Sequence, residues 1–361
     1  MALNKAVVED YRILTNIICC LVRGDVAAAV EILRRQATTM DRIRELLNKN
    51  NLAGYFYAII NDAGVADYLS DELLRELKSS YLKQVRRNDC LLELLKKLQE
   101  EFESASVPFL TLKGIYLSQR FMGDFRRRFM WDLDILVQPA DLGHAVDAAI
   151  TAGLEHKSSV PLDPRIQRWG LHAIDLKGEL GNLDIHFALR NLPGIDFNYE
   201  RIWATSGTFN VDGVSFPTID DEHTLLISLL GVGTDIQCSH HNLRKILDIF
   251  LMLLDLDESM DWEVFFANRQ TEGTLKLVLN VLAFCIHYLA DFSDCPSLVQ
   301  SMESRKKLIR VESTAAAESI FMRGRQSIAN RLFFSRLLPV SMSYYWIWWL
   351  LTLPLRYWQH R

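Results

Sequence analysis

Hydrophobic positions along the first hundred residues recur at the spacing of amphipathic helices. The segment DVAAAVEILRRQA (25–37) carries apolar residues three or four positions apart, and the segment 71–104 repeats this spacing over a much longer run. Asp71 stands where a helix-capping residue is expected. The pattern therefore predicts an N-terminal helical region over residues 1–106.

At Pro108 the pattern changes to short apolar runs and strict alternation, which are typical of strands. Turn and cap residues separate these runs, including a proline that opens one helical segment and a glycine that ends it. In chain order we expect a strand at 108–114, a helix at 115–123, a strand at 131–137, a helix at 139–153 and two strands within 171–189. A β-α-β-α-β-β unit is therefore predicted over Pro108–Leu189.

From Asp220 onward, helical spacing returns. Four helices are expected, within 220–233, 242–256, 261–270 and 274–292. The prediction is an α+β protein with three parts. A small mixed sheet within residues 107–219 is flanked by the N-terminal helical region and by a C-terminal helical region over 220–361.

The composition narrows the classes of function. Of the 361 residues, 49% are hydrophobic and 24% are charged, which is typical of a globular protein with a sizeable core. The net charge is −5 and the isoelectric point is near 6.0, whereas general nucleic-acid binders usually carry a basic face. A nucleic-acid partner is therefore not expected.

The cysteines and the first residues indicate a cellular compartment. None of the six cysteines forms a C-x-x-C pair, so neither a disulfide framework nor a zinc site is predicted. The first residues, MALNKAVVEDYRILTN, include acidic and polar residues where a secretory signal would need an apolar core. We expect a reduced, cytoplasmic protein.

The C-terminal segment 341–361 is rich in tryptophan and tyrosine. Its unbroken apolar stretch, Tyr344–Leu351, is far shorter than the roughly 20 residues of a membrane-spanning helix. The favoured interpretation is a buried helix that ends before Pro354. The alternative is a peripheral membrane contact, with the aromatic rings at the headgroups and Arg356 and Arg361 outside.

Two aspartates interrupt the apolar strand FMWDLDILV. Because successive side chains of a strand face opposite sides, Asp132 and Asp134 share one face and Leu133 and Ile135 point into the core. Two carboxylates held this close favour a cation between them. Oxygen ligands are those that Mg²⁺ or Mn²⁺ prefers, so this strand is a candidate metal site.

Three further features strengthen this interpretation. Upstream, Lys113 and Gly114 form a turn that opens a helix, where backbone N–H groups can meet phosphates. Asp184 lies on a later strand that can stand beside the first pair. The three arginines of 126–128 immediately precede the aspartates and could hold phosphate oxygens.

In this order the motifs resemble a bacterial group of uncharacterised nucleotidyltransferases, within the superfamily of DNA polymerase beta. The resemblance covers roughly Pro108–Leu254. Its motifs here are Leu112-Lys113-Gly114, Arg128, the run Asp132–Val137, the run Leu183–His186, and Leu243-Arg244 followed by Asp248. The resemblance implies a nucleotidyltransferase-type sheet and transfer of a nucleotidyl group with two metal ions.

The resemblance also implies residue roles. Asp132 and Asp134 would bind the metal that carries the triphosphate, and Asp184 would join them at a second metal and serve as base. Lys113 and Gly114 would contact phosphate. Arg128 would contact phosphate or support the aspartate strand, as follows from its place in the motif.

The remaining motif residues have two interpretations each. His186 shares the face of Asp184 and could orient a nucleotide or assist a metal, but a structural histidine is about as well supported. Arg244 and Asp248 are four apart on a helix, which suits an ordinary i,i+4 ion pair. The resemblance alone implies that they line the substrate cleft.

We therefore expect a metal-dependent enzyme that moves a nucleoside monophosphate from a nucleoside triphosphate, ATP first among them, to a hydroxyl. The acceptor would be a small molecule or a protein side chain, and pyrophosphate would leave. The alternative is a catalytically degenerate relative that binds a nucleotide or a partner. Ile115 follows Gly114 where the superfamily usually has serine, and Trp131 stands where a small or polar residue is more typical. Carboxylates within metal reach would favour the enzyme, and carboxylates held in salt bridges would favour the alternative.

Overall fold

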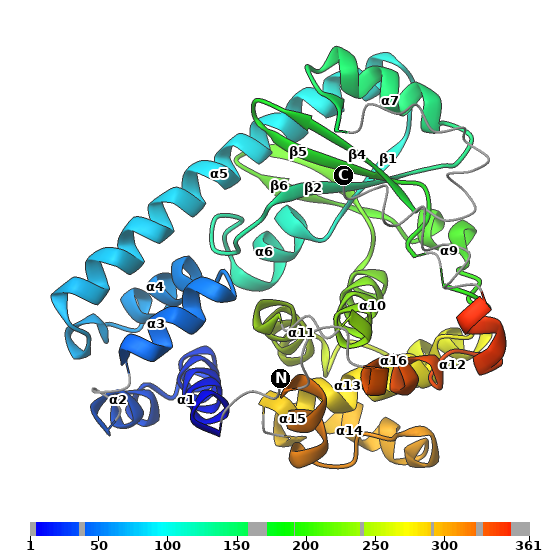
Figure 1. The fold of residues 1–361 in the computed structure, drawn as a ribbon. Coiled ribbons are helices and arrows are strands. Elements are labelled where there is room, and N and C mark those ends of the chain that lie inside the picture. The colour runs from blue at the N-terminus through cyan, green and yellow to red at the C-terminus, as the bar shows by residue number, and fades with distance from the viewer. Residues whose placement is uncertain are drawn as a thin grey trace.

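The N-terminal region is helical and ends in one long helix (Figure 1). The structure is a computed structural model, which describes residues 5–35, 40–157, 172–190, 192–238, 242–289, 292–322 and 328–347. The region comprises α1 (Lys5–Val22), α2 (Val26–Arg35), α3 (Met40–Lys49), α4 (Ala53–Asp62), the short helix η2 (Ala66–Tyr68) and α5 (Asp71–Ser104). Helix α5 runs from these helices to the sheet, so it links the N-terminal region to the core.

One detail of the α5 start differs from the expectation. Ser70, rather than Asp71, is the capping residue, and its hydroxyl accepts a hydrogen bond of 3.3 Å from the Leu73 backbone N–H. Asp71 lies in the first turn instead. A carboxylate there still favours the helix because it interacts with the positive end of the helix dipole.

A seven-stranded mixed sheet forms the centre, in the order β3-β4-β5-β2-β1-β7-β6. Its strands are β1 (Phe109–Leu112), β2 (Asp132–Val137), β3 (Glu155–His156), β4 (Ala173–Gly178), β5 (Gly181–His186), β6 (Gly207–Val211) and β7 (Val214–Thr218). Strand β2 pairs antiparallel with β1 and parallel with β5. The α+β prediction of a mixed sheet flanked by helical regions is confirmed.

Three strands were not predicted. Strand β3 is only two residues long, which leaves no pattern to detect. Strands β6 and β7 form a hairpin over the turn Asp212–Gly213, where both residues have positive φ, 50° and 82°. Asp-Gly between alternating apolar residues is a strong hairpin signal, so this hairpin could have been predicted.

The two faces of the sheet contact different hydrophobic clusters. Leu133 and Ile135 of β2 face a cluster with the second half of α5 and with α7 (Leu142–Thr151), as expected from the alternation. Leu110 and Leu136, which are partners in the β1–β2 register, face a larger cluster that includes the N-terminal and C-terminal helices. Asp134 shares this second face, because its register partner is Leu112.

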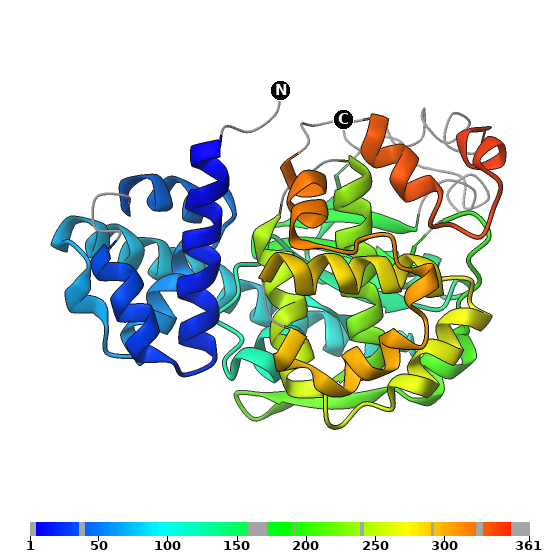
Figure 2. The same cartoon turned by 90° about the horizontal axis from the view of Figure 1, so that it is seen from below.

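The C-terminal region is again helical and packs beside the N-terminal helices on the second face of the sheet (Figure 2). Two further helices, α6 (Gly114–Met122) and α9 (Tyr199–Ala204), belong to the sheet region. The C-terminal helices are α10 (Asp221–Cys238), α11 (Leu243–Leu256), α12 (Trp262–Thr271), α13 (Leu275–Leu289), η3 (Phe292–Asp294), α14 (Pro296–Glu303), η4 (Lys306–Leu308), α15 (Thr314–Met322) and α16 (Ile328–Ser335). Over the residues that the structure describes, every helix is too short or too polar to cross a bilayer.

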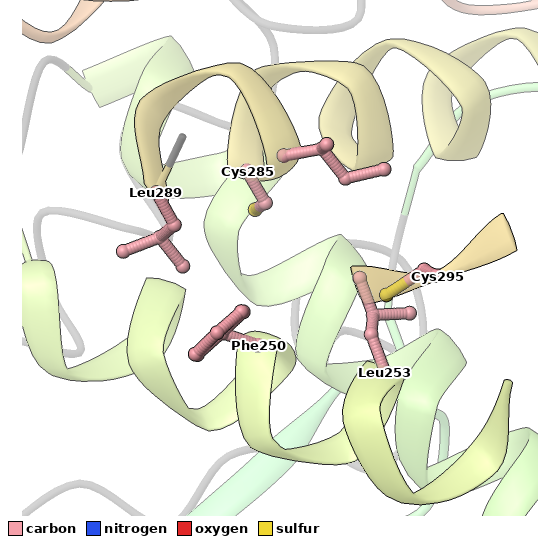
Figure 3. A pocket seen from close by; sticks show the side chains of 6 residues that line it. Phe250, Leu253, Cys285, Leu289 and Cys295 are labelled. Carbon is pink, nitrogen blue, oxygen red and sulfur yellow. The ribbon is translucent and has the colours of Figure 1, made fainter. Parts of the chain in front are cut away.

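The packing of α11 against α13 leaves a small apolar cavity (Figure 3). Its volume is about 10 Å³, near the lower limit for one water molecule. It is lined by Phe250, Leu253, Cys285, Ile286, Leu289 and Cys295. Burial raises the pKa of the Cys295 thiol to about 12, so the cavity is a packing defect between unreactive groups.

Part of the aromatic tail is described. Residues 342–347 are helical, and Tyr345 is fully buried whereas Tyr344 and Ile347 are exposed. The Tyr345 hydroxyl is hydrogen-bonded to Gln237 of α10. This part of the tail therefore packs on the body of the protein, and residues 348–361 lie outside the described residues.

Candidate functional site

The pairing of β2 with β5 brings the predicted carboxylates together. In the parallel register Asp134 lies opposite Asp184, and Asp132 lies opposite Asn182, all on one face of the sheet. One ligand atom each from Asp134, Asp184 and His186 lie within 4.8 Å of one another. This set offers two carboxylate oxygens and one imidazole nitrogen, whereas Asp132 borders it.

Asp134 has two basic partners. Its Oδ1 lies 2.8 Å from Nε2 of His186 and 3.3 Å from the Lys113 ammonium. The Asp134 and Lys113 side chains are only 14% and 21% exposed, so these contacts are well shielded from water. Asp134 and Asp184 therefore lie within metal reach of each other, but Asp134 is held in a salt bridge.

The three carboxyl groups have different proton affinities. Burial would raise the pKa of Asp134, but the Lys113 charge and the His186 hydrogen bond bring it well below its usual value. Burial and the charge of Asp134 raise the pKa of Asp132 to about 6. Burial and the charge of Asp134 also raise the pKa of Asp184, to about 8, and the charges of Asp132 and Asp175 add to this effect. The site holds more negative charge than its basic groups offset.

Asp175 on β4 is an acidic neighbour that sequence analysis missed. It is the register partner of Asp184 in the antiparallel β4–β5 hairpin, so both side chains share the site face. A two-residue loop separates Gly178 from Gly181, and such a short loop sets the register of the hairpin. Counting back from Asp184 across that loop would have found Asp175.

The Lys113–Gly114 turn is bent into an unusual conformation. Lys113 has φ 43° and Gly114 has φ 36°, both in a region that side chains disfavour. A Cβ atom on Gly114 would lie 3.3 Å from the Met130 sulfur, so the turn also packs closely against the segment before β2. Helix α6 begins at Gly114, and its N-terminal N–H groups are available to an anion.

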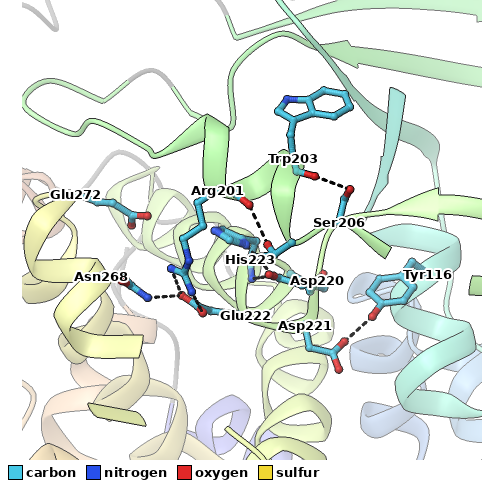
Figure 4. A network of polar contacts seen from close by, with 12 residues as sticks. Tyr116, Arg201, Trp203, Ser206, Asp220, Asp221, Glu222, His223, Asn268 and Glu272 are labelled. Carbon is cyan, nitrogen blue, oxygen red and sulfur yellow. Dashed lines mark hydrogen bonds and ion pairs between the residues drawn. The ribbon is translucent and has the colours of Figure 1, made fainter. Parts of the chain in front are cut away.

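Contacts at the start of α10 hold helix α6 in place (Figure 4). The Tyr116 hydroxyl, in the first turn of α6, donates a hydrogen bond to Asp221. Arg120 forms ion pairs with Asp221 and Asp255, at 3.2 and 2.7 Å. These contacts fix the turn relative to the C-terminal helices.

Arg128 and Asp248 bind each other. Arg128 Nε lies 3.0 Å from both carboxylate oxygens of Asp248, and Nη2 lies 2.8 Å from Oδ2. Both side chains are buried, 10% and 3% exposed. Asp248 therefore pairs with Arg128, 120 residues away in the sequence, and not with Arg244, four residues away. Because this pair engages the guanidinium, the geometry favours a role of Arg128 in supporting the aspartate strand over a contact with phosphate.

Helix α5 clamps the arginine-rich turn before β2. The side-chain amide of Gln84 donates to the carbonyls of Arg126 and Arg127, at 2.8 and 2.7 Å. One turn later Asn88 donates to the carbonyls of Phe125 and Arg128, at 3.0 and 2.7 Å.

The side chains of the first two arginines are also engaged. Arg126 lies 2.7 Å from Asp89, and Arg127 lies 2.6 Å from Asp62. All three arginines of this turn thus have carboxylate partners, so the turn braces the aspartate strand.

Arg244 of α11 is a buried basic group whose charge acts on Asp132. It is 8% exposed, and Nη1 donates a hydrogen bond to the Phe129 carbonyl. Its Nε has no hydrogen-bond partner among the described residues. Burial and the charge of Arg128 lower its pKa to about 10, which marks a cation with little compensation.

Further basic side chains beside Lys113 were missed. Burial lowers the pKa of Lys245, with Arg190 and Lys113 adding to the effect, although Asp235 pairs with Lys245 at 2.9 Å. The ring of His172 lies 5.4 Å from the ring of His186. Neither Arg190 nor Lys245 is one of the motif residues. They could not be predicted as neighbours of Lys113, because only the fold brings α11 and the end of β5 together.

A comparison with known protein families identifies the group to which the chain belongs. A family described as "Uncharacterised nucleotidyltransferase" matches residues 36–290, which is more than half of the chain. The chain belongs to this family. No curated protein matches this member of the family.

One solved structure is similar in part. It is described as an antigenic nucleotidyltransferase-like protein from Paracoccidioides brasiliensis, and it is 18% identical to this family member. The similarity covers 53% of this chain and 92% of that one, with a TM-score of 0.33.

Proposed function

We propose that this family member is a divalent-metal-dependent nucleotidyltransferase. It transfers a nucleoside monophosphate from a nucleoside triphosphate to a hydroxyl of a small molecule or a protein side chain. The observation that carries this proposal is the convergence of Asp134, Asp184 and His186 within 4.8 Å, beside a turn that opens a helix.

The residues at this position fit a divalent metal. The donor set of two carboxylates and an imidazole suits Mn²⁺, and with water ligands it suits Mg²⁺. The raised pKa values of Asp132 and Asp184 indicate negative charge that lacks a cation. Asp134, Asp184 and His186 would hold the ion, and we propose that Asp132 joins them. Such an ion neutralises phosphate charge and acidifies the attacking hydroxyl.

The protein's own groups account for the remaining chemistry. Asp184 would serve as the base that accepts the proton of the acceptor hydroxyl once a cation is bound, because a bound cation would lower the pKa of its carboxyl group from the metal-free value near 8. The hydroxyl oxygen forms the new bond to the α-phosphorus, and the bond from that phosphorus to the bridging oxygen breaks as pyrophosphate leaves. Lys113 and the N–H groups at Gly114 would bind the triphosphate, and Lys245 and Arg190 add positive charge for it.

The partners and the location follow as part of the same proposal. ATP is the first nucleotide to test, and a nucleic-acid acceptor is not expected for a chain with a net charge of −5. The described cysteines, Cys19, Cys20, Cys90, Cys285 and Cys295, are all free, which supports a reducing compartment such as the cytoplasm.

In a second candidate function the protein has the same fold but no catalytic activity. In this alternative the protein binds a nucleotide or a partner without transferring a group. The salt bridge between Lys113 and Asp134 favours it, because an ammonium there supplies charge that a metal would supply. Ile115, which stands where the superfamily usually has serine, favours it as well.

Calorimetry with each Mg²⁺–nucleoside triphosphate tests the proposal. We compare wild type with Asp132→Asn/Asp134→Asn, and with Asp141→Asn/Asp147→Asn as a control. The control removes two carboxylates from the N-cap and body of α7, on the other side of the sheet. We expect Mg²⁺-dependent binding in wild type and in the control, and none in the site variant.

Turnover separates the two candidates. Release of pyrophosphate, or transfer of an α-labelled nucleotide to a fraction of cell extract, would support the enzyme. Binding without either would support the second candidate. Equal binding by the site variant and wild type would place the nucleotide elsewhere and refute the site.

A further inference from the structure

Trp131 is the residue beside the site that the proposed function leaves unexplained. Half of its surface is exposed, 50%, although it directly precedes the buried carboxylate Asp132. A half-exposed aromatic side chain contributes little to stability through burial, so burial does not explain why a tryptophan stands beside these charged groups.

The indole of Trp131 is held in a fixed arrangement. Its ring meets the Phe129 ring edge to face, with centroids 4.7 Å apart and an interplanar angle of 78°. The Arg87 guanidinium, from α5, lies 4.7 Å from the indole centroid and 5.5 Å from that of Phe129. Aromatic and cation–π contacts of this kind orient a ring before a ligand arrives.

The segment that carries this aromatic pair, residues 129–131, contacts two parts of the proposed nucleotide site. The residue between the two rings, Met130, packs against Gly114 of the phosphate turn. Phe129 lies 5.8 Å from the Arg244 guanidinium, and its carbonyl accepts a hydrogen bond from that group. Trp131 therefore follows the residue that packs on the phosphate turn and directly precedes a candidate metal-binding carboxylate.

We infer that Trp131, backed by Phe129 and Arg87, is the stacking platform for the nucleobase of the nucleoside triphosphate. This inference rests on the proposed function. With the phosphates on the Gly114 turn and the aspartates, the ribose carries the base outward toward the next planar surface. An indole face accepts any of the four bases, because each has a π face and none needs a specific hydrogen bond.

Arg87 adds a charge to the platform. Among the described residues it has no carboxylate partner within ion-pair distance, and its contacts are the two aromatic rings. A guanidinium that already stacks on the indole can also stack on a bound base. Arg87 thus extends the platform with a second planar group.

The N-terminal helices offer a matched control. There Arg34 lies 5.0 Å from the centroid of Tyr68, and Tyr68 is 38% exposed. This pair repeats the arginine-on-aromatic arrangement on α2 and η2, without a neighbouring carboxylate cluster. Tyr68→Ala therefore removes an exposed ring of the same kind away from the site.

The experiment compares two ligands on the full chain by calorimetry. One is the Mg²⁺–nucleoside triphosphate that wild type binds most tightly, and the other is Mg²⁺–tripolyphosphate, which lacks the base. For Trp131→Ala we expect nucleotide affinity to fall about tenfold, and tripolyphosphate affinity to remain unchanged. Trp131→Phe should keep most of the affinity, and Tyr68→Ala should keep all of it.

The outcomes separate this inference from the proposed function. Nucleotide affinity of Trp131→Ala within about twofold of wild type would overturn the platform alone, since a stacked base is worth more than that. An equal loss for nucleotide and tripolyphosphate would also overturn it, because the effect would then lie on the phosphates. Wild type that binds neither ligand would overturn the proposed function and the platform with it.

Discussion

Lys113 combines a strained backbone with a functional charge. Its φ of 43° is a conformation that side chains disfavour by about 1–3 kcal/mol. Its ammonium lies 3.3 Å from Asp134, so the side chain provides a reason to keep lysine where glycine would fit the backbone better. The strain and the charge can be separated by two substitutions.

We predict that Lys113→Gly is more stable than Lys113→Ala by about 1 kcal/mol. Both variants lose the ammonium, and only glycine relieves the strain. Both should bind Mg²⁺–nucleotide more weakly than wild type. Urea unfolding gives the difference in stability, and equal stability of the two variants would show that the turn is not strained.

Asp184 makes stability depend on pH. Its pKa is about 8 in the folded protein against an ordinary 3.8, so across this window the folded state keeps a proton that the unfolded chain has released. Because the folded state binds more protons, the free energy of unfolding falls as pH rises, and the loss is complete above pH 8. Asp132, raised to about 6, adds to the lower part of the window.

We predict a decline in stability from pH 7 to pH 9 for metal-free wild type, and a shallower one for Asp184→Asn. Below this range the lowered pKa values of His172 and His186 act in the opposite direction. Urea unfolding in the presence of a chelator measures both slopes. Mn²⁺ or Mg²⁺ should restore part of the stability of wild type at pH 9, since the ion supplies the missing cation. Parallel slopes for the two proteins would contradict the raised pKa of Asp184.

Among the elements, β2 and α11 are joined by the Arg128–Asp248 pair. A buried, bidentate pair costs much to break, because removal of one partner leaves the other charge buried and alone. We predict that Arg128→Met and Asp248→Leu each lower the free energy of unfolding by about 3–5 kcal/mol. The double variant should lose less than either single one. A double loss equal to the sum of the two, in urea unfolding at pH 7, would show that the pair is not coupled.

Helix α5 holds the turn before β2 through Gln84 and Asn88. Asn88→Ala leaves two buried carbonyl groups without their donor, so we predict a loss of about 1–3 kcal/mol. Gln99→Ala on the same helix is the control. Among the described residues Gln99 bonds only to the exposed Glu103, so this substitution should cost well under 1 kcal/mol. Thermal or urea unfolding measures both, and equal effects would refute the clamp.

In the whole molecule, one large hydrophobic cluster spans all three predicted parts. It includes Tyr11 of α1, Leu112 of β1, Leu136 of β2 and Phe334 of α16. The boundaries proposed at 106/107 and 219/220 therefore separate regions of the chain that share a core. The second half of α5 also covers the other face of the sheet.

We predict that the full chain unfolds in one cooperative transition. Parts that share a core lose it together, so far-ultraviolet circular dichroism and tryptophan fluorescence should give the same midpoint in urea. Two separated midpoints would show that the helical regions and the sheet are independent folding units.

Much of this architecture follows from local pattern. Alternation placed Asp132 and Asp134 on one face of β2, with Leu133 and Ile135 buried behind them. Helical spacing located α5 and the C-terminal helices, and the Asp-Gly turn of the missed β6–β7 hairpin was visible to the same rules. These features depend on residues close in sequence, whose side chains must match the period of the element that they form.

The partners of the charged groups could not be obtained in this way. The i,i+4 spacing favoured Arg244 as the partner of Asp248, yet Arg128 binds it across the fold, and Lys113 rather than Arg128 reaches Asp134. Asp175, Arg190 and Lys245 join the site only because strand register and helix packing bring them there. Local spacing fixes which residues share a face, whereas the distances and burial that select ion pairs and shift pKa values arise only when distant elements pack.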